Sequence, residues 1–423
     1  MKRISLFLLL FLLLKATAVY SQGGDPEANL RIVPISPNAA SLGTYGLIPT
    51  DNYVGQANLT IPIYEIDLDG KKFPIALSYH TDGTRVAQEA TWAGLGWTLQ
   101  AGGCVIRQVQ DMDDFTARGC YNLTDAPWLT NPRFEVTDQN MERYMGYFRG
   151  DYDAEPDMFY FNAGGHSGSM FFNVLKNNRQ TNAVPTIQTQ EEVVKMVYNT
   201  SSNVWTMTDL EGYVYSFSKK ETTYYFLNTI EFFQPDITRS HIFPYNKEPQ
   251  VVTAWMLDSV TSPNGGTILF DYKKETIFTP ISTTEDVISL SEVVAGEITS
   301  QSPQYFKNKF NYNYTYSKIE QWTLSKISFE GGTVEFNTTD REDIESAESG
   351  KKVQKLSSIK VSDAAGNVIK TTMLEYKYLL SGAATTTNGY DDRLLLSKVY
   401  DVAGSKKSNV YTMDYNMGKL PPK

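Results

Sequence analysis

The stretch Phe73–Arg107 reads FPIALSYHTDGTRVAQEATWAGLGWTLQAGGCVIR and consists of two extended segments around a turn-rich centre. Its first part alternates apolar residues with smaller or polar ones, which is the period-2 pattern of a half-buried strand. Its centre places Gly94 and Gly96 between Trp92 and Trp97. Glycines allow close backbone approach or a positive φ, and indole rings fill the space that the glycines leave. The stretch therefore predicts a packed corner between sheets rather than a ligand pocket.

The same alternation predicts hairpins on either side of this stretch. Residues 58–79 alternate and turn at Asp69 and Gly70, which indicates a β-hairpin. Pro62 is expected on an edge strand or at the start of a strand, because its nitrogen has no proton to donate to a neighbouring strand. Residues 157–172 again show the order strand, glycine turn, strand.

Other segments are expected to lie outside the sheets. Residues 37–52 carry turn formers throughout, and residues 140–148 are the best short helix candidate of the first half. Three segments are expected to form long surface insertions because they contain few large apolar residues or many charges. These insertions are residues 276–308, 338–355 and 379–392.

The second half repeats one frame: Leu-x-x-Ile/Val, a few polar residues, a glycine and an alternating aromatic strand. The units are Leu257–Tyr272, Leu324–Phe336, Leu356–Tyr376, Leu396–Tyr415 and, in part, Thr208–Phe217. Each unit predicts a hairpin, and several must stack side by side because one hairpin alone is marginally stable. We predict an all-β fold of antiparallel sheets, with a sandwich-like N-terminal β domain over residues 22–175 and an array of β-hairpins over residues 176–423.

Composition supports a globular protein and argues against a nucleic-acid partner. Hydrophobic residues make up 41% of the 423 residues and charged residues 20%, which argues against disorder. The 27 tyrosines and 21 phenylalanines favour strands. The formal charge of the whole chain is −10. A nucleic-acid partner is not expected, because no basic stripe is present to neutralise phosphates.

The first residues read MKRISLFLLLFLLLKATAVYSQ and predict a secretory signal peptide over residues 1–21. A basic start, an apolar run over Ile4–Leu14 and small residues at the cleavage options Ala18 and Ser21 are typical of such a leader. Removing its three basic residues leaves 35 basic against 48 acidic residues, a charge of −13. The apolar run is too short for a permanent membrane helix. We expect export to the periplasm, the cell surface or the extracellular medium, with no transmembrane segment after cleavage.

The chain contains two cysteines, Cys104 and Cys120. Export permits a disulfide between them, and a bridge that closes a loop of this length would contribute about 3 kcal/mol. Two buried free thiols are the alternative that the spacing leaves open. The scattered histidines His80, His166 and His241 lack the spacing of metal ligands, so no zinc site is expected.

Two acidic clusters are candidate Ca²⁺ sites, because alternating carboxylates in a loop supply the oxygen ligands that this ion prefers. They are Asp111, Asp113 and Asp114, and Asp151, Asp153, Glu155 and Asp157. Neither has EF-hand spacing, and a solvated acidic loop is the alternative reading. The segment Gly164-Gly-His-Ser-Gly168 has the wrong spacing for a nucleophile elbow and predicts a hairpin turn. No catalytic or cofactor-binding residue is therefore assigned, and no enzyme activity is expected.

Several of these segments resemble the N-terminal region of secreted Rhs/YD-repeat proteins of the Bacteroidetes type. The segments are Pro37–Gly43, Ile61–Tyr64, Pro74–Tyr79, Gly94–Leu99 and a second match within Glu155–Gly168. The pattern is similar to the opening of Rhs toxins and of the B subunits of insecticidal toxin complexes. The resemblance implies a region that leads into a β-rich shell and carries no catalytic residue. Trp92, Gly94, Gly96 and Trp97 are then a structural signature.

The resemblance implies a non-enzymatic, exported scaffold that takes part in a toxin-carrying or cell-surface assembly. The chain would correspond to the N-terminal region of its relatives, without their downstream repeat shell and C-terminal toxin. Its partner would be a downstream Rhs-type chain or a surface partner. The alternative is a secreted module that binds glycans or a host protein through exposed Tyr and Trp. An apolar, unpaired sheet edge near residues 410–423 would favour the scaffold.

Overall fold

The computed structural model of the chain describes residues 33–47, 59–80, 88–110, 112–122, 141–148, 151–153, 155–173, 182–188, 194–233, 241–244, 250–279, 282–289, 308–380, 392–403 and 406–418. Strands dominate this part of the chain, so the predicted all-β fold is confirmed. The predicted signal peptide lies outside the described residues, as do residues 381–391 of the third predicted insertion.

A small sheet contains three strands in the order β1-β2-β3. Strands β1 (Leu59–Leu68) and β2 (Lys71–Tyr79) form the predicted hairpin, and β3 (Trp97–Gln100) pairs with the far side of β2. Asp69 and Gly70 both have positive φ, of 50° and 93°, as a tight two-residue hairpin turn requires. The prediction for Pro62 is also confirmed, because β1 is an edge strand of this sheet.

The large sheet contains the remaining strands, and its pairings are antiparallel. They are β4 (Gly103–Gln108), β5 (Met158–Ala163), β6 (His166–Phe171), β7 (Asn182–Ala183), β8 (Thr186–Ile187), β9 (Val194–Asn199), β10 (Val204–Asp209), β11 (Val214–Phe233), β12 (His241–Pro244), β13 (Gln250–Thr261), β14 (Thr267–Phe278), β15 (Ser282–Ser289), β16 (Asn308–Phe329), β17 (Gly332–Asp340), β18 (Gln354–Asp363), β19 (Val368–Leu379), β20 (Arg393–Ala403) and β21 (Lys406–Thr412). Because β4 pairs with β13, one sheet continues across the predicted boundary at residue 175, and the division into two domains stays a prediction.

The predicted hairpin units are confirmed as β13–β14, β16–β17, β18–β19, β20–β21 and, for the partial unit, β10–β11. From β16 to β21 each strand pairs with the strand before it, so the sheet grows in chain order. Gly265 and Gly366 lie in the turns of two units and have φ of 93° and 85°. The repeated glycine therefore marks the turn because the backbone there adopts a conformation that suits glycine.

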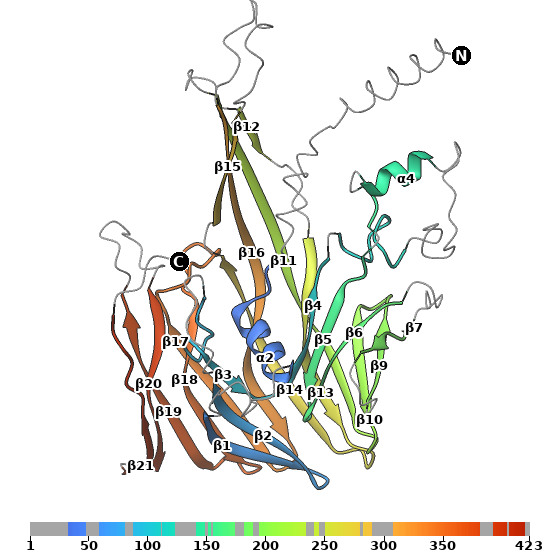
Figure 1. Cartoon of the computed structure of the whole chain (residues 1–423). Helices are drawn as coiled ribbons and strands as arrows, with labels where there is room; N and C mark the ends of the chain where they lie inside the picture. The colour runs from blue at the N-terminus through green and yellow to red at the C-terminus, as the bar shows by residue number, and fades with distance from the viewer. Residues whose placement is uncertain are drawn as a thin grey trace, which may run out of the picture.

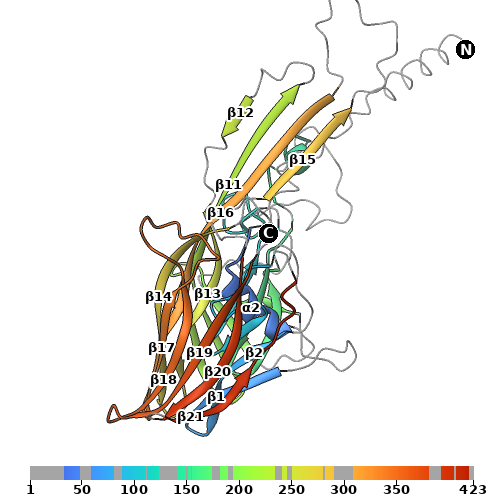
Figure 2. The ribbon, with the colours of Figure 1, turned by 90° about the vertical axis from the view of Figure 1, so that its left-hand side faces the viewer.

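Four strands of the large sheet close a ring. The first part of β11 pairs with β13 and its second part with β16, while β14 pairs with both β13 and β16. Side chains bridge the ring: the Tyr272 hydroxyl donates to the Leu257 carbonyl and the Trp322 indole N–H donates to the Lys220 carbonyl, both at 2.6 Å. Above the ring, β11 and β16 continue as a long ribbon flanked by β12 and β15 (Figures 1 and 2).

Helix α2 (Pro37–Leu47) occupies the segment that was predicted to consist of turns, so that prediction is wrong. The Ser36 hydroxyl accepts a hydrogen bond from the Ala39 N–H at 3.2 Å and thereby caps the helix. Pro37 is the first helical residue, where the missing N–H has no partner to lose. The helix packs against β4, and Gly43 permits this approach: a Cβ there would lie 2.3 Å from a methyl of Ile106.

The segment before α2 is anchored to β11 by buried hydrogen bonds. The Ser36 N–H and hydroxyl donate to the two carboxylate oxygens of Glu221 at 2.8 and 2.6 Å. The Thr223 hydroxyl donates to the Pro34 carbonyl at 2.9 Å. Burial raises the pKa of Glu221 to about 7, although the bonds from Ser36 favour the charged carboxylate. The anchor thus contains a carboxyl group that titrates near neutral pH.

The second described helix, α4 (Met141–Phe148), matches the helix predicted over residues 140–148. Among the described residues, no helix has the length and apolar character needed to cross a bilayer. The predicted insertion at 338–355 is not a simple surface excursion, because Ile344 and Val353 pack in a buried cluster with Ile277 of β14.

A main core joins the small sheet to the large one. It includes Ile61, Ile66 and Leu77 of the small sheet together with inward residues of β5, β10, β13 and β16 to β20. Aromatic rings occupy part of this core: the Trp205 ring lies 4.7 Å from Tyr198 and 6.2 Å from Trp255 between ring centres. The alternation seen in the sequence therefore points apolar residues into one interior.

The raised pKa of Glu221 predicts how the stability of the fold depends on pH. Between about pH 4.5 and about pH 7 the folded protein keeps a proton that the unfolded chain releases, so stability falls as pH rises. Glu221→Gln removes this group. Across that interval we expect the free energy of unfolding of the native protein to fall by about 3 kcal/mol relative to that of the variant.

Urea unfolding of both proteins at a series of pH values measures this difference. Glu335→Gln, at a partly exposed position on β17, is the control, and its stability should run parallel to that of the native protein. A Glu221→Gln curve that also runs parallel to the native one would contradict the assignment of a buried, protonated carboxyl group.

Candidate functional site

The four signature residues lie in one corner between β2 and β3, and this corner contacts the far end of the chain. Trp97 is buried, and its indole N–H donates to the Tyr415 hydroxyl at 2.9 Å. Tyr415 in turn donates to the Leu396 carbonyl of β20 at 2.8 Å. Sequence reasoning predicted the packed corner and missed Tyr415, because nothing in the local pattern connects residues that are so far apart.

The backbone of the corner also bonds to two strands of the hairpin array. The Leu95 N–H donates to the Leu394 carbonyl of β20 at 2.8 Å, and the Leu356 N–H of β18 donates to the Trp92 carbonyl at 2.9 Å. Gly94 has φ of 112°, and a Cβ there would lie 3.0 Å from the Leu396 backbone nitrogen. The predicted role of this glycine, close backbone approach at a positive φ, is therefore confirmed.

A buried ion pair completes the corner. Arg341 donates to the carbonyls of Thr91 and Ala90 at 3.0 and 3.2 Å and pairs with Asp343 at 2.7 Å. Asp343 also accepts the Leu394 N–H at 3.2 Å. The side chains of the pair are 2% and 0% exposed, although both residues lie in the segment that was predicted to be a surface insertion. High local charge suggested solvent exposure there, and the partners that make burial possible are distant in sequence.

Strand β21 belongs to the large sheet and lies next to this corner. Among the strands that the structure describes it pairs with β20 alone, and all seven of its residues are exposed. Exposed apolar side chains follow this edge, namely Val410, Tyr411 and, beyond the strand, Met417. The strand is nevertheless held in place: the Asn409 amide donates to Asp401 at 2.7 Å and the Met413 N–H donates to the Ser397 carbonyl at 3.0 Å. An apolar edge near residues 410–423 would favour the scaffold interpretation; the strand carries two exposed apolar residues, Val410 and Tyr411, among polar and charged ones.

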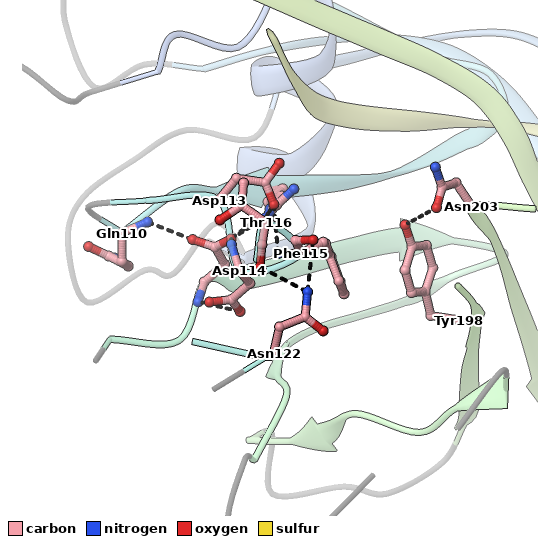
Figure 3. A network of polar contacts seen from close by, with 10 residues as sticks. Gln110, Asp113, Asp114, Phe115, Thr116, Asn122, Tyr198 and Asn203 are labelled. Atoms are coloured by element: carbon pink, nitrogen blue, oxygen red, sulfur yellow. Dashed lines mark hydrogen bonds and ion pairs between the residues drawn. The ribbon is translucent and has the colours of Figure 1, made fainter. Parts of the chain in front are cut away.

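The two acidic clusters predicted from the sequence meet at one arginine. Figure 3 shows Asp113 and Asp114 of the first cluster near Gln110. Arg107 of β4 is 2% exposed and its guanidinium pairs with Asp113 and Asp157. The other oxygen of Asp157 accepts the Gln110 N–H at 2.7 Å, and the Asp157 N–H donates to Asp114 at 3.0 Å. Arg107, which the sequence analysis did not single out, thus lies between carboxylates from both clusters.

Two carboxyl groups of this cluster are shifted in the same direction. Burial, together with the nearby charge of Asp157, raises the pKa of Asp114 to about 8, and burial also raises the pKa of Asp157. Asp153 is buried and its charge also raises the pKa of Asp114, whereas Asp111 lies outside the described residues. In the described part of the chain no three acidic, His or Cys residues are placed to hold a metal ion. Calcium binding stays a prediction.

Cys104 and Cys120 are both buried, and no disulfide joins them in the structure. Cys104 packs under α2, where its thiol lies 3.9 Å from the Ala39 carbonyl, and Cys120 lies in the loop that follows β4. Burial raises the pKa of the Cys104 thiol to about 12, which makes it unreactive at neutral pH. Of the two readings that the sequence left open, this arrangement matches buried thiols.

Comparison with known proteins found no matching family model and no matching curated protein. Solved structures that match include the crystal structure of TcdB2-TccC3-Cdc42, with 11% identity and a TM-score of 0.37 over 85% of this chain and 15% of that one. The structure of the Photorhabdus luminescens Tc holotoxin pore matches with 11% identity and a TM-score of 0.38, over 90% of this chain and 16% of that one. The similarity is weak, and this chain spans less than a fifth of the length of those chains.

The packing of the corner predicts that Gly94→Ala lowers the free energy of unfolding more than Gly165→Ala does, although both glycines have a positive φ. Gly165→Ala places a methyl group in open space, so only backbone strain applies and we expect a loss of about 1–2 kcal/mol in unfolding free energy. Gly94→Ala adds a clash with the β20 backbone, which should cost about 1–3 kcal/mol more. Chemical denaturation measures both values. Equal losses would mean that close packing of the corner on β20 contributes nothing to stability.

The Arg107 cluster predicts a large effect from one substitution. Asp157→Ala leaves a buried guanidinium with one carboxylate fewer, and we expect a loss of about 3–5 kcal/mol in the free energy of unfolding. The control is Glu335→Ala, which removes a 2.5 Å pair with Lys360 whose side chains are 38% and 35% exposed. That pair should contribute at most about 1 kcal/mol. Similar losses for both variants, measured by urea unfolding, would contradict the buried cluster.

Proposed function

We propose that the chain is a non-enzymatic, exported structural protein of the Rhs/YD-repeat type, whose sheet is extended by a further strand at β21. The observation that carries this proposal is the edge strand itself. One side of β21 pairs with β20, and its residues are exposed on both faces of the sheet. A strand in this position offers a row of N–H and C=O groups on its outer side, which is the template for strand addition.

The pairing order of the strands indicates which kind of unit would be added beside β21. Strands β17 to β21 each pair with the strand before them, and the hairpins β18–β19 and β20–β21 share one sequence frame. The next hairpin of the same kind would continue the sheet without any change in geometry. We therefore infer that the occupant is a β-hairpin unit of an Rhs-type chain, as the resemblance of the sequence implies.

The edge is rigid enough to serve as a template. The Trp97–Tyr415 hydrogen bond and the bond from Tyr415 to Leu396 fix the segment after β21 against the N-terminal corner. A strand that is already ordered loses less conformational entropy when it gains a neighbour. The exposed side chains of Val410 and Tyr411 would then be covered, which adds an apolar contribution to pairing.

The remaining parts of the proposal follow from the sequence. The signal peptide supports export to the periplasm, the cell surface or the extracellular medium. The similarity to Rhs toxins supports a role in a toxin-carrying or cell-surface assembly. The buried charges of the corner and of the Arg107 cluster are engaged with protein partners, and we assign them a structural role rather than a catalytic one.

The test is the mass of residues 22–423 in solution, measured by light scattering alone and after co-expression with the product of the next gene downstream. We expect a defined complex with that partner, and we expect Val410→Lys with Tyr411→Lys to abolish it, because the substitutions remove the exposed apolar side chains of the strand and add two charges to those of Lys406 and Lys407. The matched control is Val368→Lys with Ile369→Lys, which changes two apolar residues of similar exposure away from the edge.

Each outcome of this test decides the proposal. A complex that is lost in the edge variant and kept in the control variant supports strand addition at β21. A monodisperse monomer that does not bind the partner would show that β21 is not the assembly surface. A complex that still forms in the edge variant would show the same.

A further inference from the structure

A cavity of about 830 Å³ lies at the end of the sheets where the hairpins turn. Turns from four hairpins line it: β1–β2, β5–β6, β10–β11 and β13–β14. These turns are far apart in the sequence and converge at the lower end of the molecule in Figure 1. The volume is within the range of about 300–1,000 Å³ that small-molecule sites occupy.

Side-chain bonds hold the turns in fixed positions around this cavity. The Tyr213 hydroxyl donates to the Leu68 carbonyl at 3.0 Å, which ties the β10–β11 turn to the end of β1. The Ser262 hydroxyl, in the β13–β14 turn, donates to the Asp69 carboxylate of the β1–β2 turn. Lys71 pairs with Asp209, which joins β2 to the end of β10. The polar groups of the cavity are therefore pre-organised, which lowers the entropic cost of binding a ligand.

The charges of the cavity disfavour an anionic ligand. Its only lysine or arginine among the lining residues is Lys71, and two carboxylates, Asp209 and Glu211, neutralise it at 2.5 and 3.1 Å. Asp69 adds a third carboxylate. Burial and the nearby Lys71 lower the pKa of His166, which favours the neutral imidazole, while Asp209 lies 3.8 Å from its Nε2 atom. Phosphate, sulfate or carboxylate groups would meet an excess of negative charge.

The side chains of Glu211 and His166 are suited to form hydrogen bonds with the hydroxyl groups of a ligand. The Glu211 side chain is 65% exposed and accepts hydrogen bonds, and a neutral imidazole both donates and accepts one. Leu210, which is 80% exposed, and Pro263 add apolar surface beside them. A sugar ring presents vicinal hydroxyls at its edge and C–H groups on its face. We propose that this cavity binds a neutral saccharide unit, with Glu211 and His166 bonding its hydroxyls and Leu210 contacting its face.

Calorimetric titration of the mature chain, residues 22–423, tests the proposal. The probes are maltohexaose, cellohexaose and chitohexaose, with sulfated dextran oligosaccharide as the anionic comparison. We expect at least one neutral probe to bind and the sulfated one not to bind. Glu211→Ala, in an exposed turn, should weaken the binding at least tenfold.

The matched control is Glu342→Ala, because Glu342 is 69% exposed, pairs with a lysine as Glu211 does, and is not part of the cavity. Its affinity for the probe should equal that of the native protein. Three results would overturn the proposal: no binding of any neutral probe, tighter binding of the sulfated probe, or unchanged affinity in Glu211→Ala. Since β21 takes no part in the cavity, these results are independent of strand addition at the sheet edge.

Discussion

The contact on which the rest of the structure depends is the docking of the tryptophan corner onto the hairpin array. Residues 90–97 bond to β18 and β20 through their backbone and to Tyr415 through Trp97. Without this contact the small sheet and the last hairpins would be joined by apolar packing, which does not specify a register, and by side-chain bonds such as that from the Lys370 ammonium to the Ile63 carbonyl at 3.0 Å. Backbone hydrogen bonds to a defined strand position do specify one, and Gly94 permits the approach that they need.

In two places a buried arginine with its carboxylate partners also fixes one part of the chain on another. Arg341 with Asp343 supports the corner, and Arg107 with its carboxylates supports the loop between β4 and β5. An isolated buried charge is costly, so the N–H groups of both arginines donate hydrogen bonds to carboxylates or backbone carbonyls. These arginines bond to irregular segments, where backbone groups have no strand neighbour to pair with. We interpret both clusters as the means by which long loops are fixed on a sheet.

The two proposed functional surfaces, the outer strand β21 and the cavity at the hairpin turns, lie at different places in the fold. The corner holds the segment after β21 in position, so the edge of the sheet is ordered and exposed. At the hairpin turns, bonds between neighbouring turns shape a polar cavity. An ordered edge suits association with another strand, while a cavity of fixed polar groups suits a small polar ligand. The proposed scaffold would thus carry an assembly surface and a separate binding site.

Much of the local structure was determined by the sequence alone. Alternation, glycine turns and the repeated frame predicted the all-β class, the hairpins from β1–β2 to β20–β21 and the packed corner at Trp97, because strand periodicity and turn chemistry are local properties. Helix α2 was missed because its Gly- and Pro-containing segment is a poor helix by propensity, and it is stabilised by the Ser36 cap and by contacts with β4. Arg107, Arg341, Tyr415 and the cavity were decided only by tertiary structure. Each depends on partners from strands or turns far apart in the sequence, and no local pattern records which distant residues will meet.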